Sequence, residues 1–238
     1  MKDVVFSGHQ PNFLPYMGFF YKIFKSDIFV LDDDVQYTSS GCSHKDGITV
    51  RHNSNVIRVG DEAKKITVPV KQELGDRINE VRIVSDGRWK DKLLKTVKCN
   101  YGKHPYADLG LSILSEALDA DYERLSDLNI RLIKDIVNGF GFETKIIVAS
   151  KDVPTELTSN ARNIFQCLEV GANVYYSGVG GKAYNDEKAY ADHDIRLEYS
   201  DYAPVRYRQF HKKDFIENLS VLDYVFNCGF QIPEDWSK

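Results

Sequence analysis

Short apolar runs alternate with amphipathic segments at both ends of the chain. Residues 4–8 and 28–33 are apolar runs that predict buried strands, and residues 19–27 between them carry apolar side chains at helical spacing. The same alternation returns later, with predicted strands at 145–150, 173–178 and 195–202 and predicted helices at 161–172 and 220–229. This pattern predicts an α/β fold with a mostly parallel sheet flanked by helices.

The middle of the chain has a different pattern. Residues 35–61 are polar and rich in turn residues, which predicts hairpins and loops, and strands are expected at 64–72 and 81–86. Helices are expected at 89–102 and as two segments within 111–141, the second capped by Ser126 or Asp127 and closed by Gly139 or Gly141. We therefore expect a more helical middle sub-layer. Without a linker or internal repeat, residues 1–238 are interpreted as a single domain.

Composition and charge narrow the class of protein. Hydrophobic residues are 42%, charged residues are 28% and the net charge is −4, as in ordinary globular proteins without a general affinity for nucleic acid. The four cysteines form no C-x-x-C pair, so neither a zinc site nor a disulfide framework is predicted, and we assign no metal site. No signal peptide or membrane-spanning run is recognised, which predicts a cytoplasmic protein.

Polar clusters follow four of the predicted strands, at residues 7–12, 32–37, 149–152 and 176–184. In open α/β sheets, ligands bind at the carboxyl ends of the strands. The clusters are therefore expected to form one site if their strands are neighbours.

The first cluster contains His9 and Asn12, spaced like the HxxN turn of class I nucleotidyltransferases, although Pro11 stands where those enzymes usually have glycine. An imidazole at this position can act as a general base or acid near neutral pH. The alternative is a histidine whose hydrogen bonds are satisfied within the turn.

The second and fourth clusters suit charged ligands. Asp32 and Asp34 should share one side of the strand and could hold Mg²⁺ or an ammonium group, unless they form a solvated strand end. Residues 178–182 contain three glycines and a lysine, which could present amides and a positive charge to phosphate, although the Walker A spacing is absent. The alternative is a tight turn that requires positive φ.

Residues 8–37 resemble the opening signature of the WbqC-like family, H-Q-P-x-F-L-P-aromatic-x-G-F-F-x-K followed by D-x-V-Q-aromatic. The resemblance continues over nearly the whole chain, through TVPV at 67–70, LSDLN at 125–129, YYSGVGGKAY at 175–184 and YRQF at 207–210. It implies a role in bacterial surface-polysaccharide biosynthesis and glycine transfer onto amino sugars. One departure is His44-Lys45-Asp46, which replaces an Asn-Arg-Asn run of the family; Lys45 offers a point charge without the bidentate arginine fork.

From these observations we hypothesise a transferase that forms an amide on a nucleotide-linked amino sugar, with His9 as general base and Asp34 orienting the ammonium group or His9. The expected substrate-binding residues are Gln10, Asn12, Gln36, Lys45, Ser177, Gly178, Gly180, Lys182, Tyr184 and Gln209. The acyl donor stays open: the His9 turn favours ATP and an adenylate, whereas the basic segment 204–215 favours aminoacyl-tRNA. The alternatives are a non-catalytic sugar-nucleotide-binding module and a nucleotidyltransferase-like enzyme.

Overall fold

The computed structural model describes residues 2–38, 42–43, 48–84, 86–210 and 214–237. Its centre is a five-stranded sheet with the order β11-β10-β1-β2-β9, in which every neighbouring pair is parallel. The strands are β1 (Val5–His9), β2 (Ile28–Leu31), β9 (Lys145–Val148), β10 (Val174–Ser177) and β11 (Arg196–Tyr199). The predicted α/β class with a mostly parallel sheet is confirmed.

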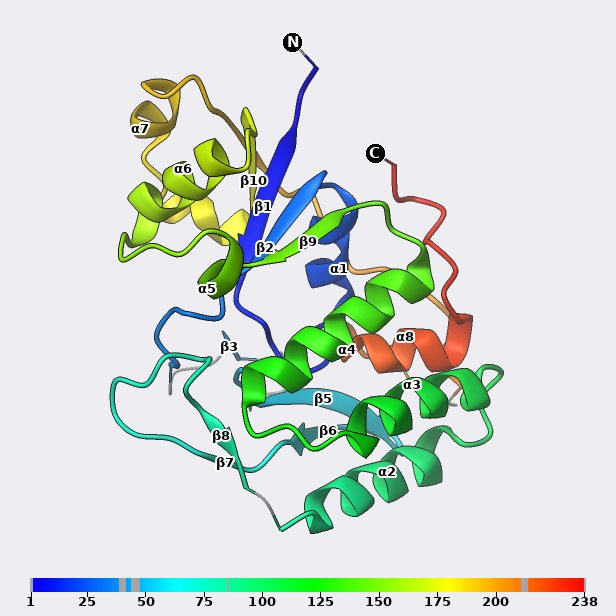
Figure 1. The fold of residues 1–238 in the computed structure, drawn as a ribbon. Helices are drawn as coiled ribbons and strands as arrows, with labels where there is room; N and C mark the ends of the chain where they lie inside the picture. Colours follow the sequence, from blue (N-terminus) through cyan, green and yellow to red (C-terminus); the bar gives the residue numbers. More distant parts are fainter. Residues whose placement is uncertain (1, 39–41, 44–47, 85, 211–213, 238) are drawn as a thin grey trace.

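Helices cover both faces of this sheet (Figure 1). Alternate residues of β2 explain why, because Phe29 and Leu31 belong to one hydrophobic cluster and Val30 to another. The first cluster includes α1 (Met17–Phe24), α4 (Leu125–Phe140) and α8 (Val221–Cys228), and the second includes α5 (Ala149–Asp152), α6 (Ser159–Glu169) and α7 (Glu187–Ala191). The strands are therefore buried on both faces, as their continuous apolar runs predict.

The chain between β2 and β9 forms the second half of the molecule (Figure 1). It contains the small pairs β3 (Cys42–Ser43) with β4 (Thr49–Val50), β5 (Ser54–Val59) with β6 (Glu62–Thr67), and β7 (Val70–Lys71) with β8 (Arg82–Ile83). The helices α2 (Arg88–Tyr101), α3 (Ala107–Asp119) and α4 follow in order. The more helical middle expected from the sequence is therefore present.

Two local predictions were wrong in detail. The strand predicted at 64–72 is broken, because β6 ends at Thr67 and β7 begins at Val70, with Pro69 between them unable to donate to a ladder. Helix α4 begins at Leu125 with Arg124 in the N-cap position, which places Asp127 in the first turn, where its charge favours the helix dipole. The predicted closure at Gly141 is confirmed by its left-handed φ of 67°.

Candidate functional site at the carboxyl edge of the sheet

The order in which the chain adds strands to the sheet reverses between β1 and β10. From β1 the chain adds β2 and then β9 on one side, and it returns to add β10 and β11 on the other. In doubly wound folds the crevice at such a switch point, at the carboxyl ends of the strands, is the usual ligand site. His9 is the last residue of β1 and Ser177 the last residue of β10, so both flank this switch point.

His9 is held from two sides. Its Nδ1 lies 3.0 Å from the carbonyl oxygen of Gln10, and the ring packs edge-on against Phe19 of α1. A carbonyl oxygen only accepts, so Nδ1 carries the hydrogen and Nε2 keeps its lone pair. Nε2 makes no hydrogen bond to any described residue. His9 therefore presents a proton acceptor at the switch point.

The lysine of α1 adds a positive charge beside this histidine. Lys22 is buried and donates from Nζ to the carbonyl oxygen of Gly8 at 2.9 Å. Burial, with the charge of Lys22 second, lowers the pKa of His9 to about 4. Burial also lowers the pKa of Lys22 itself to about 8. Near pH 7 the site thus holds a neutral imidazole next to a lysine ammonium.

The side chains of the three aspartates after β2 point to opposite sides in turn, as alternation along an extended chain predicts. Asp32 and Asp34 both pair with Arg162 of α6, whose Nη2 lies 3.0 Å from Asp32 Oδ1 and also contacts Asp34 Oδ1. Asp33 points the other way and accepts from the backbone N–H and hydroxyl of Ser150 at 2.9 and 2.7 Å. The expectation that Asp32 and Asp34 share a side is confirmed, and both are buried.

Arg162 does not act alone on Asp32. Gln166, one helical turn further along α6, donates from Nε2 to Asp32 Oδ1 at 2.8 Å. Burial raises the pKa of Asp32, and the bonds from Gln166 and Arg162 oppose that shift. No hydrogen bond joins His9 to Asp34 among the described residues, so the carboxylate pair is organised by α6.

The glycine loop after β10 is a 3₁₀ turn, η1 (Val179–Ala183), and none of its glycines has positive φ. The alternative of a turn requiring positive φ was therefore wrong. Gly181 is needed for packing, because a Cβ there would lie 2.2 Å from Ser177 Oγ. At Gly178 and Gly180 a Cβ would meet nothing within 4 Å, so neither packing nor backbone geometry in this structure requires glycine there.

Alanine at these positions should separate packing from ligand approach. We expect Gly181→Ala to lower the free energy of unfolding by about 1–3 kcal/mol through overpacking against Ser177. Gly180→Ala should change it by less than about 0.5 kcal/mol, because its Cβ enters open space. Urea unfolding of both variants measures the difference. Equal losses in the two variants would contradict this assignment.

The remaining predicted residues differ in how accessible they are. Lys182 is exposed, with Nζ 5.3 Å from the centre of the Tyr199 ring, and Tyr184 is 69% exposed. Gln36 is also exposed, and the side chain of Gln10 makes no hydrogen bond to any described residue. Lys45 lies outside the described residues. The accessible side chains could contact a ligand without losing a bond inside the protein.

Gln209 lies in a different environment. Its Oε1 accepts from Arg58 Nη1 at 2.7 Å and from the Ile216 N–H at 3.0 Å, and its Nε2 donates to Ile216 O and Asp223 Oδ2. These bonds use both donors and both acceptor positions of the amide. The structure therefore places Gln209 in a buried network that ties segment 209–216 to β5 and α8.

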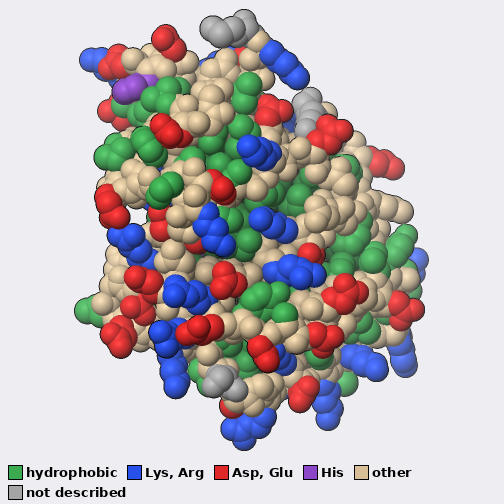
Figure 2. Space-filling model, viewed as in Figure 1, with side chains coloured by type: hydrophobic (Ala, Val, Ile, Leu, Met, Phe, Trp, Pro, Cys, Tyr) green, Lys and Arg blue, Asp and Glu red, His purple; other side chains and the backbone are tan. Residues whose placement is uncertain are grey.

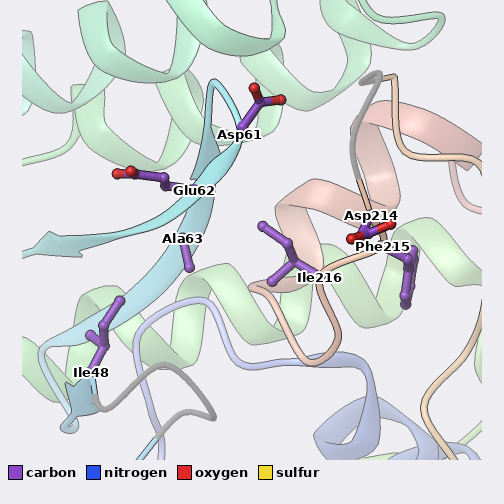
Figure 3. Close-up of a pocket in the computed structure, with 7 residues that line it drawn as sticks. All are labelled: Ile48, Asp61, Glu62, Ala63, Asp214, Phe215 and Ile216. Carbon is purple, nitrogen blue, oxygen red and sulfur yellow. The ribbon is translucent and has the colours of Figure 1, made fainter.

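A pocket of about 410 Å³ lies elsewhere, between the β5–β6 hairpin and the segment before α8 (Figure 3). Its described lining consists of Ile48, Asp61, Glu62, Ala63, Asp214, Phe215 and Ile216. None of these is a residue predicted for the site, and none is a histidine, lysine or cysteine. We place the candidate site at the sheet edge because the tuned imidazole and the glycine loop are there.

Two further classes of feature, a metal-binding cluster and a membrane-spanning helix, are absent from the described part of the chain. It contains no group of three or more histidine, cysteine, aspartate or glutamate side chains placed to hold a metal ion. Its helices include none with the length and apolar character needed to cross a bilayer. The face drawn in Figure 2 shows positive and negative side chains interspersed, in keeping with the small net charge.

Comparison with known proteins assigns the chain to a family. The family model described as "WbqC-like protein family" matches residues 10–234. The chain belongs to the WbqC-like family. It is 29% identical over 231 residues to the uncharacterized protein Rv1507c of Mycobacterium tuberculosis, covering 94% of each chain. No solved structure has significant similarity to it.

Four residues of this WbqC-like site were not among the predicted site residues: Lys22, His52, Arg162 and Gln166. Lys22 is a charged residue within an apolar helix, and Arg162 and Gln166 are polar residues one turn apart on a helix that packs on the sheet. In the sequence, the available signal for these three residues was a polar side chain at a helix position expected to be buried. His52 lies in a polar loop, and only its contact in space with Asn12, 2.7 Å from His52 Nδ1 to Asn12 Oδ1, identifies it.

Proposed function

We propose that this WbqC-like protein is a transferase that forms an amide on the amine of a nucleotide-linked amino sugar in surface-polysaccharide biosynthesis. The observation that carries the proposal is the neutral imidazole of His9 at the sheet's switch point, whose Nε2 has no hydrogen-bond partner among the described residues. An amine becomes nucleophilic when its proton is removed, and a positioned imidazole can accept that proton.

The other residues have roles that follow from their charge and exposure. In this proposal Asp34, held by Arg162, orients the substrate ammonium. Gln10 and Gln36 hydrogen-bond sugar hydroxyl or carbonyl groups, Asn12 hydrogen-bonds an oxygen of the ligand, and Lys45 adds a positive charge. The phosphates bind the backbone and the lysine side chain of the glycine loop. The loop residues in this role are Ser177, Gly178, Gly180, Lys182 and Tyr184.

Amide formation also needs an activated carboxyl group. We propose two donor systems, ATP with an amino acid to form an adenylate, or an aminoacyl-tRNA. The first releases pyrophosphate and the second releases uncharged tRNA, so the products separate them. Glycine is the proposed amino acid, in line with the family resemblance.

One observation favours a second candidate function. A histidine with a pKa of about 4 is a weaker base than one tuned to neutral pH. A non-catalytic module that binds a sugar nucleotide needs no base, and it would use the same glycine loop and amides. A nucleotidyltransferase-like enzyme has less support, because Pro11 follows the histidine turn where close approach of a nucleotide is needed.

Mass spectrometry with thermal-shift measurements tests the proposal. The purified protein is incubated with nucleotide amino sugars and either ATP plus glycine or glycyl-tRNA. A mass gain of one glycyl group on the sugar supports aminoacyl transfer, and the donor that gives it identifies the activation route. Thermal stabilisation by the sugar nucleotide, without product from either donor, would favour the binding module.

A further inference from the structure

A chain of three polar side chains lies directly beside the His9 turn. Thr38 Oγ1 is 3.3 Å from His52 Nε2, and His52 Nδ1 is 2.7 Å from Asn12 Oδ1. His52 is only 7% exposed and packs against the ring of Tyr37. A protonated His52 would lower the pKa of His9.

The polarity of this chain is fixed by its members. Burial lowers the pKa of His52 to about 4, so near pH 7 one ring nitrogen donates and the other accepts. The amide oxygen of Asn12 can only accept, so Nδ1 of His52 carries the hydrogen. Nε2 then accepts from the Thr38 hydroxyl. The direction of donation runs from Thr38 through His52 to Asn12.

This orientation leaves the NH₂ group of Asn12 without a hydrogen-bond partner among the residues described here. Asn12 is partly exposed, and its Nδ2 makes no hydrogen bond within the part of the chain that the structure describes. Nδ2 is also not among the buried side-chain atoms that lack a partner. The group is therefore a donor that solvent or a ligand can reach, three residues after His9 in the chain.

The backbone around this donor is held rigidly. The carbonyl oxygen of His52 accepts from the N–H of Phe13 and from Asn129 Nδ2, each at 2.9 Å. Asn129, fully buried on α4, also donates to the carbonyl oxygen of Pro11 at 2.9 Å. Both sides of the Asn12–His52 bond are thus tied to one helix, which is the support that a pre-oriented binding group needs.

We propose that the Asn12 NH₂ group binds an acceptor oxygen of the ligand, a phosphoryl or carbonyl oxygen, and that His52 is the positioning residue that orients it. A sugar hydroxyl can donate as well as accept, so it needs no donor of fixed direction. Fixed donors are needed where an oxygen carries or gains negative charge. If the proposed function is right, this oxygen belongs to the acyl group that is transferred. The orientation of the Asn12 donor does not depend on the proposed function.

The tautomer of His52 in the free protein is the first test. ¹⁵N NMR of histidine-labelled protein, with the His52 signals assigned by their loss in His52→Gln, reads which ring nitrogen carries the hydrogen. We expect hydrogen on Nδ1 and a bare Nε2. Hydrogen on Nε2 would overturn the proposal, because Nδ1 would then accept from a reversed Asn12 amide and no donor would face the ligand.

Asn12→Asp is the second test. It places a carboxylate on the Nδ1–H, so the pKa of His52 should rise by about 1–3 units. It also replaces the displayed donor by an acceptor, so binding of inorganic pyrophosphate, a probe with only acceptor oxygens, should weaken at least about tenfold. Asn138→Asp, exposed near the end of α4, is the charge-matched control and should change neither quantity.

The remaining outcomes are decisive as well. Two results would exclude a phosphoryl oxygen as the ligand of Asn12. One is that Asn12→Asp binds pyrophosphate as Asn138→Asp does, and the other is that the wild-type protein binds no pyrophosphate at millimolar concentration. His52→Leu should weaken binding as Asn12→Ala does, and His52→Gln, which can still donate to Asn12, should restore part of it. None of these measurements needs turnover, so failure of the transferase proposal leaves them unaffected.

Discussion

Replacing His9 by alanine is expected to lower turnover in the glycyl-transfer reaction by about 100-fold or more, because the variant loses the proposed general base. Removal of the imidazole leaves a space beside Phe19, but it breaks no hydrogen bond to another described side chain. The rate of product formation, measured by mass spectrometry at saturating sugar nucleotide, gives the effect. His193→Ala is the matched control, because the one hydrogen bond of this ring among the described residues is to the carbonyl oxygen of Ala189 in α7.

The pH profile gives this prediction a second measurement. A protonated His9 cannot accept a proton, so kcat/KM should fall as the pH decreases towards about 4, the pKa of His9. If the Lys22 ammonium contributes, activity should also fall above about pH 8, where Lys22 loses its proton. Unchanged turnover in folded His9→Ala protein would exclude His9 as the base and favour the binding module.

Replacing Arg162 by methionine is expected to lower the free energy of unfolding by about 3–5 kcal/mol at pH 7. The variant leaves Asp32 and Asp34 buried without their shared cation. A loss of this size is a large fraction of the typical total stability of about 5–15 kcal/mol. Urea unfolding monitored by circular dichroism measures it.

The control for this variant is Arg196→Met. Arg196 pairs with Asp3 and Glu198, but its side chain is 53% exposed and the pairs are screened by solvent, so its loss should cost little stability. Adding Asp32→Asn and Asp34→Asn to Arg162→Met should restore much of the lost stability, because the uncompensated charges are removed. A loss in Arg162→Met no larger than in Arg196→Met would contradict the proposed charge balance.

The difference in unfolding free energy between Arg162→Met and wild type should change with pH in a definite direction. In Arg162→Met the guanidinium no longer opposes the effect of burial, so Asp32 binds a proton more readily in the folded state than in the unfolded chain. The unfolded chain therefore binds fewer protons, and lowering the pH stabilises the variant relative to wild type. The gap in unfolding free energy between the two proteins should narrow as the pH falls from 7 towards 5.

The sequence by itself determined the class of fold and the edge of the sheet where we place the candidate site. Fully apolar strands such as 28–31 are buried on both faces, and only a sheet with helices on both sides offers that environment. The division of Asp32 and Asp34 from Asp33 also follows from the sequence, because alternation along an extended chain is a local property.

The tertiary structure alone decided which partners those residues have. Arg162 lies 130 residues from Asp32 along the chain, and no local pattern joins them. His52 and Asn12 meet because β5 packs against the turn after β1, and Gln209 is drawn into a buried network by Arg58. Periodicity records which face of an element is buried, whereas ion pairs and hydrogen bonds depend on which elements come together. The charge state and direction of the site's donors and acceptors therefore depend on long-range packing, which the order of residues does not reveal locally.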